Sequence, residues 1–70
     1  MDLNKLTIGQ MAGLNRISTQ ALRLYDREGL LTPMIIDPDT GYRYYHITQS
    51  ARLDMIQYMK DYGMTLKQIR

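Results

Sequence analysis

Apolar residues recur at helical spacing in the first part of the chain. Thr7 can cap a helix and Gln10 stands three positions later, which is the pattern of a capping box. The apolar residues that follow share one helical face: Ile8, Met11 and Ala12. The segment 13–15, Gly-Leu-Asn, is expected to end this short helix, because glycine and asparagine tolerate the left-handed backbone conformation.

A second helix is predicted to begin after Ser18, a good N-cap residue, and to end before Gly29. Its buried face consists of Ala21, Leu22 and Tyr25. Its outward positions are polar or cationic: Thr19, Gln20, Arg23 and Arg27. Two short helices joined by a turn with glycine are typical of a helix-turn-helix, whose second helix presents such a face to DNA. The alternative is an ordinary helix pair with a solvated polar face.

The pattern becomes strand-like after Pro33. The runs 34–36 and 42–45 are rich in β-branched and aromatic residues, and the turn-forming sequence Asp-Pro-Asp-Thr-Gly occupies 37–41. This predicts a β-hairpin with a longer loop, whose first strand is confined to an edge by Pro33 and Pro38.

Strand alternation places Tyr42 and Tyr44 on one face of the second strand, and Arg43 and Tyr45 on the other. One pair is therefore expected to be packed and the other free, with Tyr45 covering the core edge and Arg43 contacting a partner. Directly after a helix-turn-helix, such a hairpin is typical of a wing whose arginine and tyrosine side chains bind phosphates. The alternative is that the tyrosines cover the core and Arg43 is merely solvated.

A third helix is predicted between an N-cap at Thr48 and Gly63. Its inner face carries Leu53, Ile56 and Met59, with Ala51, Met55 and Tyr62 expected nearby. Thr65 and Gln68 form another capping box, which starts a fourth helix just before the chain ends.

These elements predict a single, mainly α-helical domain over 1–70 with the architecture of a winged helix-turn-helix. The helix-turn-helix covers about 8–27, the wing about 34–46, and a truncated helix pair about 48–70. The chain has no cysteine, which excludes disulfides and thiolate metal sites. Without a membrane-length apolar run or a signal peptide, we expect a cytoplasmic protein. The net charge of +2 is compatible with a nucleic-acid partner but does not require one.

No group of residues indicates catalysis, a metal site or a cofactor, so the chain is not expected to be an enzyme. His46, the only histidine, has no cysteine or carboxylate at metal-ligand spacing, and we expect it to help start the third helix. The turn explains Asp37 and Asp39 better than acid–base catalysis does. The six methionines are expected to fill the core rather than to form a binding surface.

Several motifs together resemble one family, the MerR-type transcription regulators. Residues 7–12 are similar to the opening of these proteins, and residues 21–31 to their recognition helix and its exit. Residues 37–45 resemble the wing of the multidrug-responsive branch. Residues 53–54 and 63–66 fit the helix pair that follows the wing in this family.

This resemblance covers residues 6–70 and implies contacts with double-stranded DNA. The matching positions are Thr19, Arg23 and Tyr25 in the recognition helix and Tyr42, Arg43 and Tyr44 in the wing. Ser18 has suitable hydrogen-bonding chemistry, and Arg16 and Arg27 are expected to be further phosphate contacts. Leu24 departs from the pattern, because many relatives have tyrosine there; either one phosphate contact is missing or Leu24 turns inward.

The resemblance also implies a longer parent protein. Family members are homodimers that bind promoter DNA, distort it and thereby act on RNA polymerase. Their long dimerisation helix and effector domain are absent here, so we expect a monomeric DNA-binding fragment. Two alternatives stay open: a winged-helix module that binds protein through the same faces, and an excisionase-like factor that bends DNA.

Overall fold

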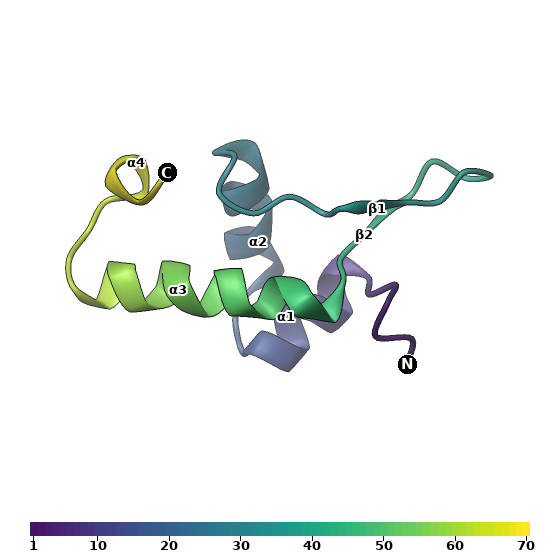
Figure 1. Cartoon of the computed structure of the whole chain (residues 1–70), viewed down its shortest axis with the longest axis horizontal. Helices are drawn as coiled ribbons and strands as arrows, with labels where there is room; N and C mark the ends of the chain where they lie inside the picture. The colour runs from purple at the N-terminus through teal and green to yellow at the C-terminus, as the bar shows by residue number, and fades with distance from the viewer.

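The computed structural model describes all 70 residues and confirms a mainly helical winged helix-turn-helix. Its elements are α1 (Ile8–Asn15), α2 (Thr19–Arg27), β1 (Ile35–Ile36), β2 (Arg43–Tyr44), the 3-10 helix η1 (Ile47–Gln49), α3 (Ser50–Asp61) and α4 (Leu66–Ile69). Figure 1 shows α3 along the long axis of the molecule, with the hairpin extending beyond one end of it and α4 at the other. The extents of 40 × 20 × 18 Å reflect this projecting hairpin.

Side-chain caps fix where three of the helices begin, as the sequence predicts. The Thr7 side chain accepts from the Gln10 backbone N–H, and the Gln10 side chain accepts from the Thr7 N–H, which completes a capping box. An equivalent box joins Thr65 and Gln68 at the start of α4. Ser18 caps α2 by accepting from the Ala21 N–H at 3.0 Å. Each cap satisfies a backbone donor that has no partner within its helix.

The end of α1 differs from the prediction. Residues 13–15 continue the helix instead of ending it, and the left-handed residue is Arg16, with φ of 56°. The Asn15 side chain supports this last turn, because its Nδ2 donates to the Met11 carbonyl at 3.0 Å and to Ser50 Oγ on α3 at 3.1 Å. Arg16 thus adopts a conformation that is costly for a residue with a Cβ.

The start of α3 also differs from the prediction. Thr48 is not its N-cap; it lies within η1, the 3-10 turn that precedes α3. His46 caps this turn, since its Nδ1 accepts from the Thr48 N–H at 3.1 Å and its own N–H donates to the Gln49 side chain. The expectation that His46 helps to start the helical segment is therefore confirmed.

The hairpin is very short. Its two strands pair antiparallel in the register Ile35 with Tyr44 and Ile36 with Arg43. Beyond β2, Tyr45 forms an isolated bridge with Leu6, so the N-terminal segment acts as a third strand at the base of the wing. Strand alternation fails here: Tyr45 is buried, as expected, but Arg43 on the same nominal face is exposed. The reason is that only the base of the hairpin lies against the core, while the tip extends past it.

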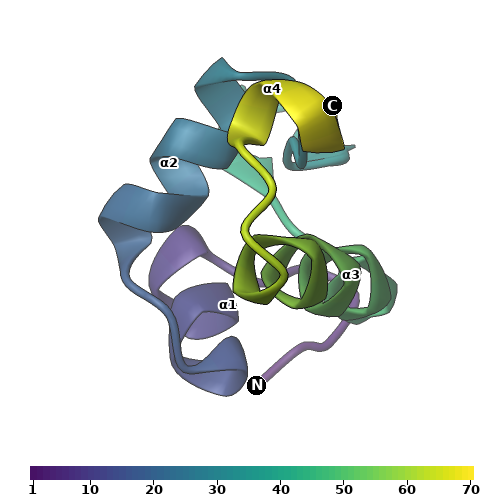
Figure 2. The ribbon, with the colours of Figure 1, turned by 90° about the vertical axis from the view of Figure 1, so that its left-hand side faces the viewer.

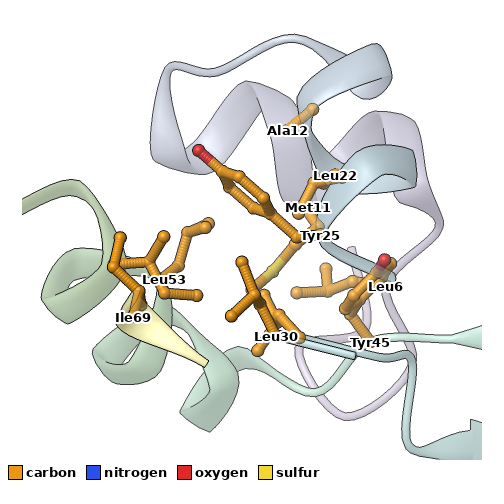
Figure 3. Packing of buried hydrophobic residues seen from close by; sticks show 11 residues of the cluster. Leu6, Met11, Ala12, Leu22, Tyr25, Leu30, Tyr45, Leu53 and Ile69 are labelled. Carbon is orange, nitrogen blue, oxygen red and sulfur yellow. The ribbon is translucent and has the colours of Figure 1, made fainter. Parts of the chain in front are cut away.

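One core joins every helix to the base of the wing, and Figure 2 shows α1, α2, α3 and α4 arranged around it. It contains no polar or charged residue apart from the tyrosine hydroxyls. Figure 3 shows how these side chains converge from different elements. The buried residues are Leu6, Met11, Ala12, Leu22, Tyr25, Leu30, Leu31, Tyr45, Leu53, Ile56 and Ile69.

Helix α3 buries only part of the face that was predicted. Leu53 and Ile56 are buried and Met59 is half-buried, as expected. The residues expected near this face are instead exposed: Ala51, Met55 and Tyr62. Tyr58 of α3 and Tyr62, which follows its last residue, are both exposed, and their ring centroids lie 4.8 Å apart. The assignment of methionine to the core holds for Met11, holds in part for Met59 and Met64, and fails for Met1, Met34 and Met55.

Candidate nucleic-acid interface

The outer face of α2 presents the cations that the sequence predicts. Arg23 and Arg27 are exposed, Gln20 is exposed between them and the N-terminus of the helix, and Thr19 is half-buried. The face exists because Leu22 and Tyr25 draw the opposite side of the helix into the core. A helix anchored on one side and cationic on the other has the form needed to enter a major groove.

The turn before α2 adds two further groups to this face. Ser18 Oγ accepts the Ala21 N–H as a cap, but a hydroxyl that accepts can still donate its own hydrogen. Arg16 is exposed in its left-handed conformation just before this cap. The N-terminus of a helix attracts anions through its free N–H groups and its dipole. Arg16 and Ser18 thus lie where a phosphate group would be favoured.

The wing exposes a tyrosine and an arginine. Tyr42 is 67% exposed at the end of the loop, and the Arg43 side chain is 51% exposed. Tyr44 is half-buried, and the Lys5 ammonium group lies 4.9 Å from the centre of its ring. Tyr42 and Arg43 are therefore free to contact a partner, whereas Tyr44 is partly covered.

An ion pair brings the wing and α2 together. Arg43 of β2 lies 4.0 Å from Asp26 of α2, and both side chains are partly exposed. Burial raises the pKa of the nearby Tyr45 phenol; the charge of Asp26 raises this pKa further, while Arg43 and Arg23 lower it. The charges of Arg23 on α2 and of Arg43 on the wing therefore both act on the hydroxyl at the base of the wing.

Tyr25, which the resemblance predicts to contact DNA, is buried in the structure. It is 1% exposed, and Figure 3 shows its ring lying across the core. Its hydroxyl accepts a hydrogen bond from Lys60 Nζ at 3.1 Å, and the same ammonium group lies 5.5 Å from the ring centre. The side chain of Tyr25 thus supports the fold of α2. The neighbouring Leu24 is half-buried and packs against the core, which agrees with an inward orientation.

Sequence patterns missed three residues next to this surface. The sequence pattern does not indicate that Asp26 is the partner of Arg43. Lys5 and Asp37 form an ion pair at 2.7 Å that joins the N-terminal segment to the wing. Alternating charge could have suggested Asp26, but no local signal links Lys5 to a residue that lies 32 positions away.

Other kinds of site are not supported by the structure. No three histidine, cysteine, aspartate or glutamate residues are grouped in a way that could hold a metal ion. None of the helices has the length and apolar character that crossing a lipid bilayer requires.

Comparison with known proteins identifies relatives of this domain. Residues 6–70 match the model of the family described as MerR HTH family regulatory protein. The chain is 41% identical over 64 residues to the multidrug-efflux transporter 1 regulator of Bacillus subtilis, covering 91% of this chain and 23% of that protein. The chain thus spans about a quarter of the length of the curated relatives it matches.

Two solved structures are similar in both sequence and fold. The regulator SkgA from Caulobacter crescentus superposes with a TM-score of 0.82 at 38% identity, covering 93% of this chain and 46% of that one. HiNmlR, a MerR family regulator that lacks the sensor domain and is bound to promoter DNA, superposes with a TM-score of 0.81 at 35% identity. That match covers 93% of this chain and 51% of HiNmlR.

Proposed function

Because the chain belongs to the MerR HTH family of regulatory proteins, we propose that it binds double-stranded promoter DNA as the operator-binding domain of a transcription regulator. In this proposal α2 enters the major groove and the wing lies on the phosphate backbone. The observation that carries the proposal is the ion pair of Arg43 in the wing with Asp26 of α2, the helix whose exposed face carries Arg23. The promoter DNA bound by the similar HiNmlR supports the same partner here.

The proposed contacts divide according to position. Thr19 and Arg23 lie on the exposed part of α2 and are assigned to base edges, where hydroxyl and guanidinium groups can recognise sequence. The remaining contacts are assigned to phosphates, which fix the register of the protein on DNA: Arg16, Ser18, Arg27, Tyr42, Arg43 and, through its exposed part, Tyr44.

The parent protein would supply the remaining functions. We propose that it is a homodimer whose two domains bind half-sites of a pseudo-palindrome, and that it acts on RNA polymerase indirectly through the shape of the promoter. Binding to chromosomal DNA would place it in the cytoplasm. One copy of this domain makes few phosphate contacts, so its own affinity is expected to be weak and steeply salt-dependent.

A titration of random-sequence duplex DNA at two salt concentrations tests the proposal. Each neutralised phosphate contributes roughly 0.9 to the slope of log affinity against log salt, so losing the phosphate contact of Arg43 in Arg23→Ala with Arg43→Ala should lower that slope by roughly 0.9. The double variant should also bind at least about tenfold more weakly at low salt. Lys67→Ala is the control for the loss of a positive charge outside the proposed surface, because Lys67 is exposed on α4, away from the wing.

Two results would reject the assigned surface. If replacing both arginines left the affinity for DNA unchanged, DNA would have to bind elsewhere. The same conclusion would follow if Lys67→Ala lowered the affinity as much as the double variant does. Binding that is almost independent of salt would instead favour a module that recognises protein.

A further inference from the structure

The wing is too short to fix its own orientation relative to the helices. Two residue pairs form its whole ladder, and its outward side chains Met34, Ile36 and Tyr42 are more than 60% exposed. An isolated two-stranded hairpin is marginally stable at best in water. Contacts from outside the hairpin must therefore set the angle at which the tip meets DNA.

The N-terminal segment supplies those contacts. Leu6 exchanges two backbone hydrogen bonds with Tyr45, at 2.8 and 2.7 Å, and both side chains are buried. Lys5 comes directly before Leu6 and lies on the wing itself. Its Nζ is 2.7 Å from Asp37 Oδ2, at the end of β1, and 4.9 Å from the ring centre of Tyr44 in β2. A single ammonium group therefore contacts both sides of the hairpin.

Asp37 transmits this contact to the tip. While Oδ2 faces Lys5, Oδ1 accepts the backbone N–H groups of Asp39 at 2.8 Å and Thr40 at 3.1 Å. The backbone of Asp37 also bonds at both ends, since its N–H donates to the Tyr42 carbonyl and its carbonyl accepts from the Gly41 N–H. Every polar group of Asp37 is thus used to join the tip to the base.

We propose that Lys5 and Asp37 form a clasp that positions the wing for binding to DNA, so that Asp37 promotes binding although its charge opposes that of DNA. The inference rests on the proposed contact between the wing and phosphates. A wing held in its bound orientation does not have to be ordered on binding, which preserves affinity. Lys5 and Asp37 are therefore positioning residues, and the contacts themselves belong mainly to the exposed residues Tyr42 and Arg43.

Two charge-neutral variants separate this role from simple electrostatics. Asp37→Asn retains an oxygen for the Asp39 and Thr40 N–H groups but removes the charge that pairs with Lys5. Asp39→Asn removes the same charge two positions away, from an exposed side chain in no ion pair. Electrostatics alone predicts that both variants bind DNA more tightly, since both remove an acid from the wing.

The clasp predicts that the two variants change the affinity for DNA in opposite directions. With a random-sequence duplex at low salt, Asp39→Asn should bind as well as wild type or up to about threefold better. Asp37→Asn should bind about three- to tenfold more weakly. Lys5→Met should weaken binding similarly, whereas Lys5→Arg, which can still pair with the carboxylate, should restore most of the affinity. Thermal melting of each variant checks that the fold is retained.

A double-mutant cycle shows whether the effect passes through the wing. In a background of Tyr42→Ala with Arg43→Ala, Asp37→Asn should change affinity by less than about twofold, because the contacts it positions are gone. General destabilisation would give the same loss in both backgrounds and would overturn the proposal. So would tighter binding by Asp37→Asn.

Backbone ¹⁵N relaxation of the free chain tests the clasp without DNA. Amides 38–42 should become more mobile in Asp37→Asn and stay as ordered as wild type in Asp39→Asn. Unchanged order in Asp37→Asn overturns the clasp, even if DNA binding proceeds as proposed. Failure of the wild-type chain to bind DNA at all would instead reject the proposed function, and the role of the clasp in binding with it.

Discussion

The helices of the body meet mainly through apolar side chains, whereas the wing meets the body mainly through backbone hydrogen bonds and two ion pairs. Helices α1 to α4 all contribute to one buried cluster that contains no charged residue. The wing contributes to that cluster only through Tyr45, at its base. Its apolar residues Met34 and Ile36 remain exposed.

This difference separates what sets the stability of the domain from what sets its recognition geometry. Apolar burial is strong and non-directional, so it holds the helices together but tolerates small changes in angle. Hydrogen bonds and ion pairs contribute less but fix direction. We therefore expect changes in the body to alter the free energy of unfolding, and changes at the base of the wing to alter mainly the binding of DNA.

The largest expected effect comes from truncating the core. Leu22 is 0% exposed on α2, so Leu22→Ala should lower the free energy of unfolding by about 2–5 kcal/mol. Domains have roughly 0.05–0.15 kcal/mol of stability per residue, which makes this a large fraction of the total for 70 residues. Urea denaturation followed by circular dichroism measures the change.

The matched change in the wing is Ile36→Ala. Ile36 is 64% exposed, so the same truncation class should cost less than about 1 kcal/mol, mostly through strand propensity. If Leu22→Ala and Ile36→Ala lowered the free energy of unfolding equally, the wing would be part of the cooperative core. That result would contradict the proposed difference between the body and the wing.

The same division explains what the sequence could predict. The caps at Thr7, Ser18 and Thr65 could be predicted from the sequence, because each cap binds a backbone group only three residues away. The contacts of Lys5 with Asp37 and of Leu6 with Tyr45 were not, because they join segments that only the folded core brings together. In the candidate site, exposed cations such as Arg23 followed from helical periodicity.

Two different predictions from the sequence meet at Tyr25. The family motif marked this position as a DNA contact, but helical spacing had already grouped Tyr25 with Ala21 and Leu22 on the buried face. The structure agrees with the spacing. Similarly, Arg16 could not be recognised as the left-handed residue, since Gly13 and Asn15 are the residue types that usually adopt that conformation.

A smaller effect is expected at Arg16, where stability and binding should change in opposite directions. Its φ of 56° is unfavourable for any residue with a Cβ, so Arg16→Gly should raise the free energy of unfolding by about 0.5–1 kcal/mol. The same change removes a proposed phosphate contact, so the slope of log affinity for DNA against log salt should fall by roughly 0.9. Urea denaturation and the DNA titration measure the two quantities.

Gly13→Ala is the control for Arg16→Gly. Gly13 lies within α1 with open space where a Cβ would be added, so alanine should stabilise the helix by up to about 1 kcal/mol. It removes no charge, and DNA binding should stay within twofold of wild type. If Gly13→Ala weakened binding as much as Arg16→Gly, rigidity of the turn, rather than loss of the Arg16 charge, would explain both.

The smallest expected change is an acid transition confined to the wing. The hydrogen bond from Lys5, followed by those from the Asp39 and Thr40 N–H groups, lowers the pKa of Asp37 from 3.8 to about 2. A lowered pKa in the folded state means that the contribution of this carboxylate is complete above pH 3.8 and is lost as the pH falls towards 2. The clasp should thus stay intact down to about pH 4.

Amide chemical shifts of Asp39 and Thr40 can follow this transition, because both N–H groups donate to Asp37. Their midpoint should lie near pH 2 in the wild-type chain and move up towards 3.8 in Lys5→Met, which removes the largest cause of the shift. The buried core has no carboxylate to protonate, so amides of Leu22 and Leu53 should not report this transition. If the core amides followed the same midpoint, the wing would unfold together with the body, and the two regions would not be held independently.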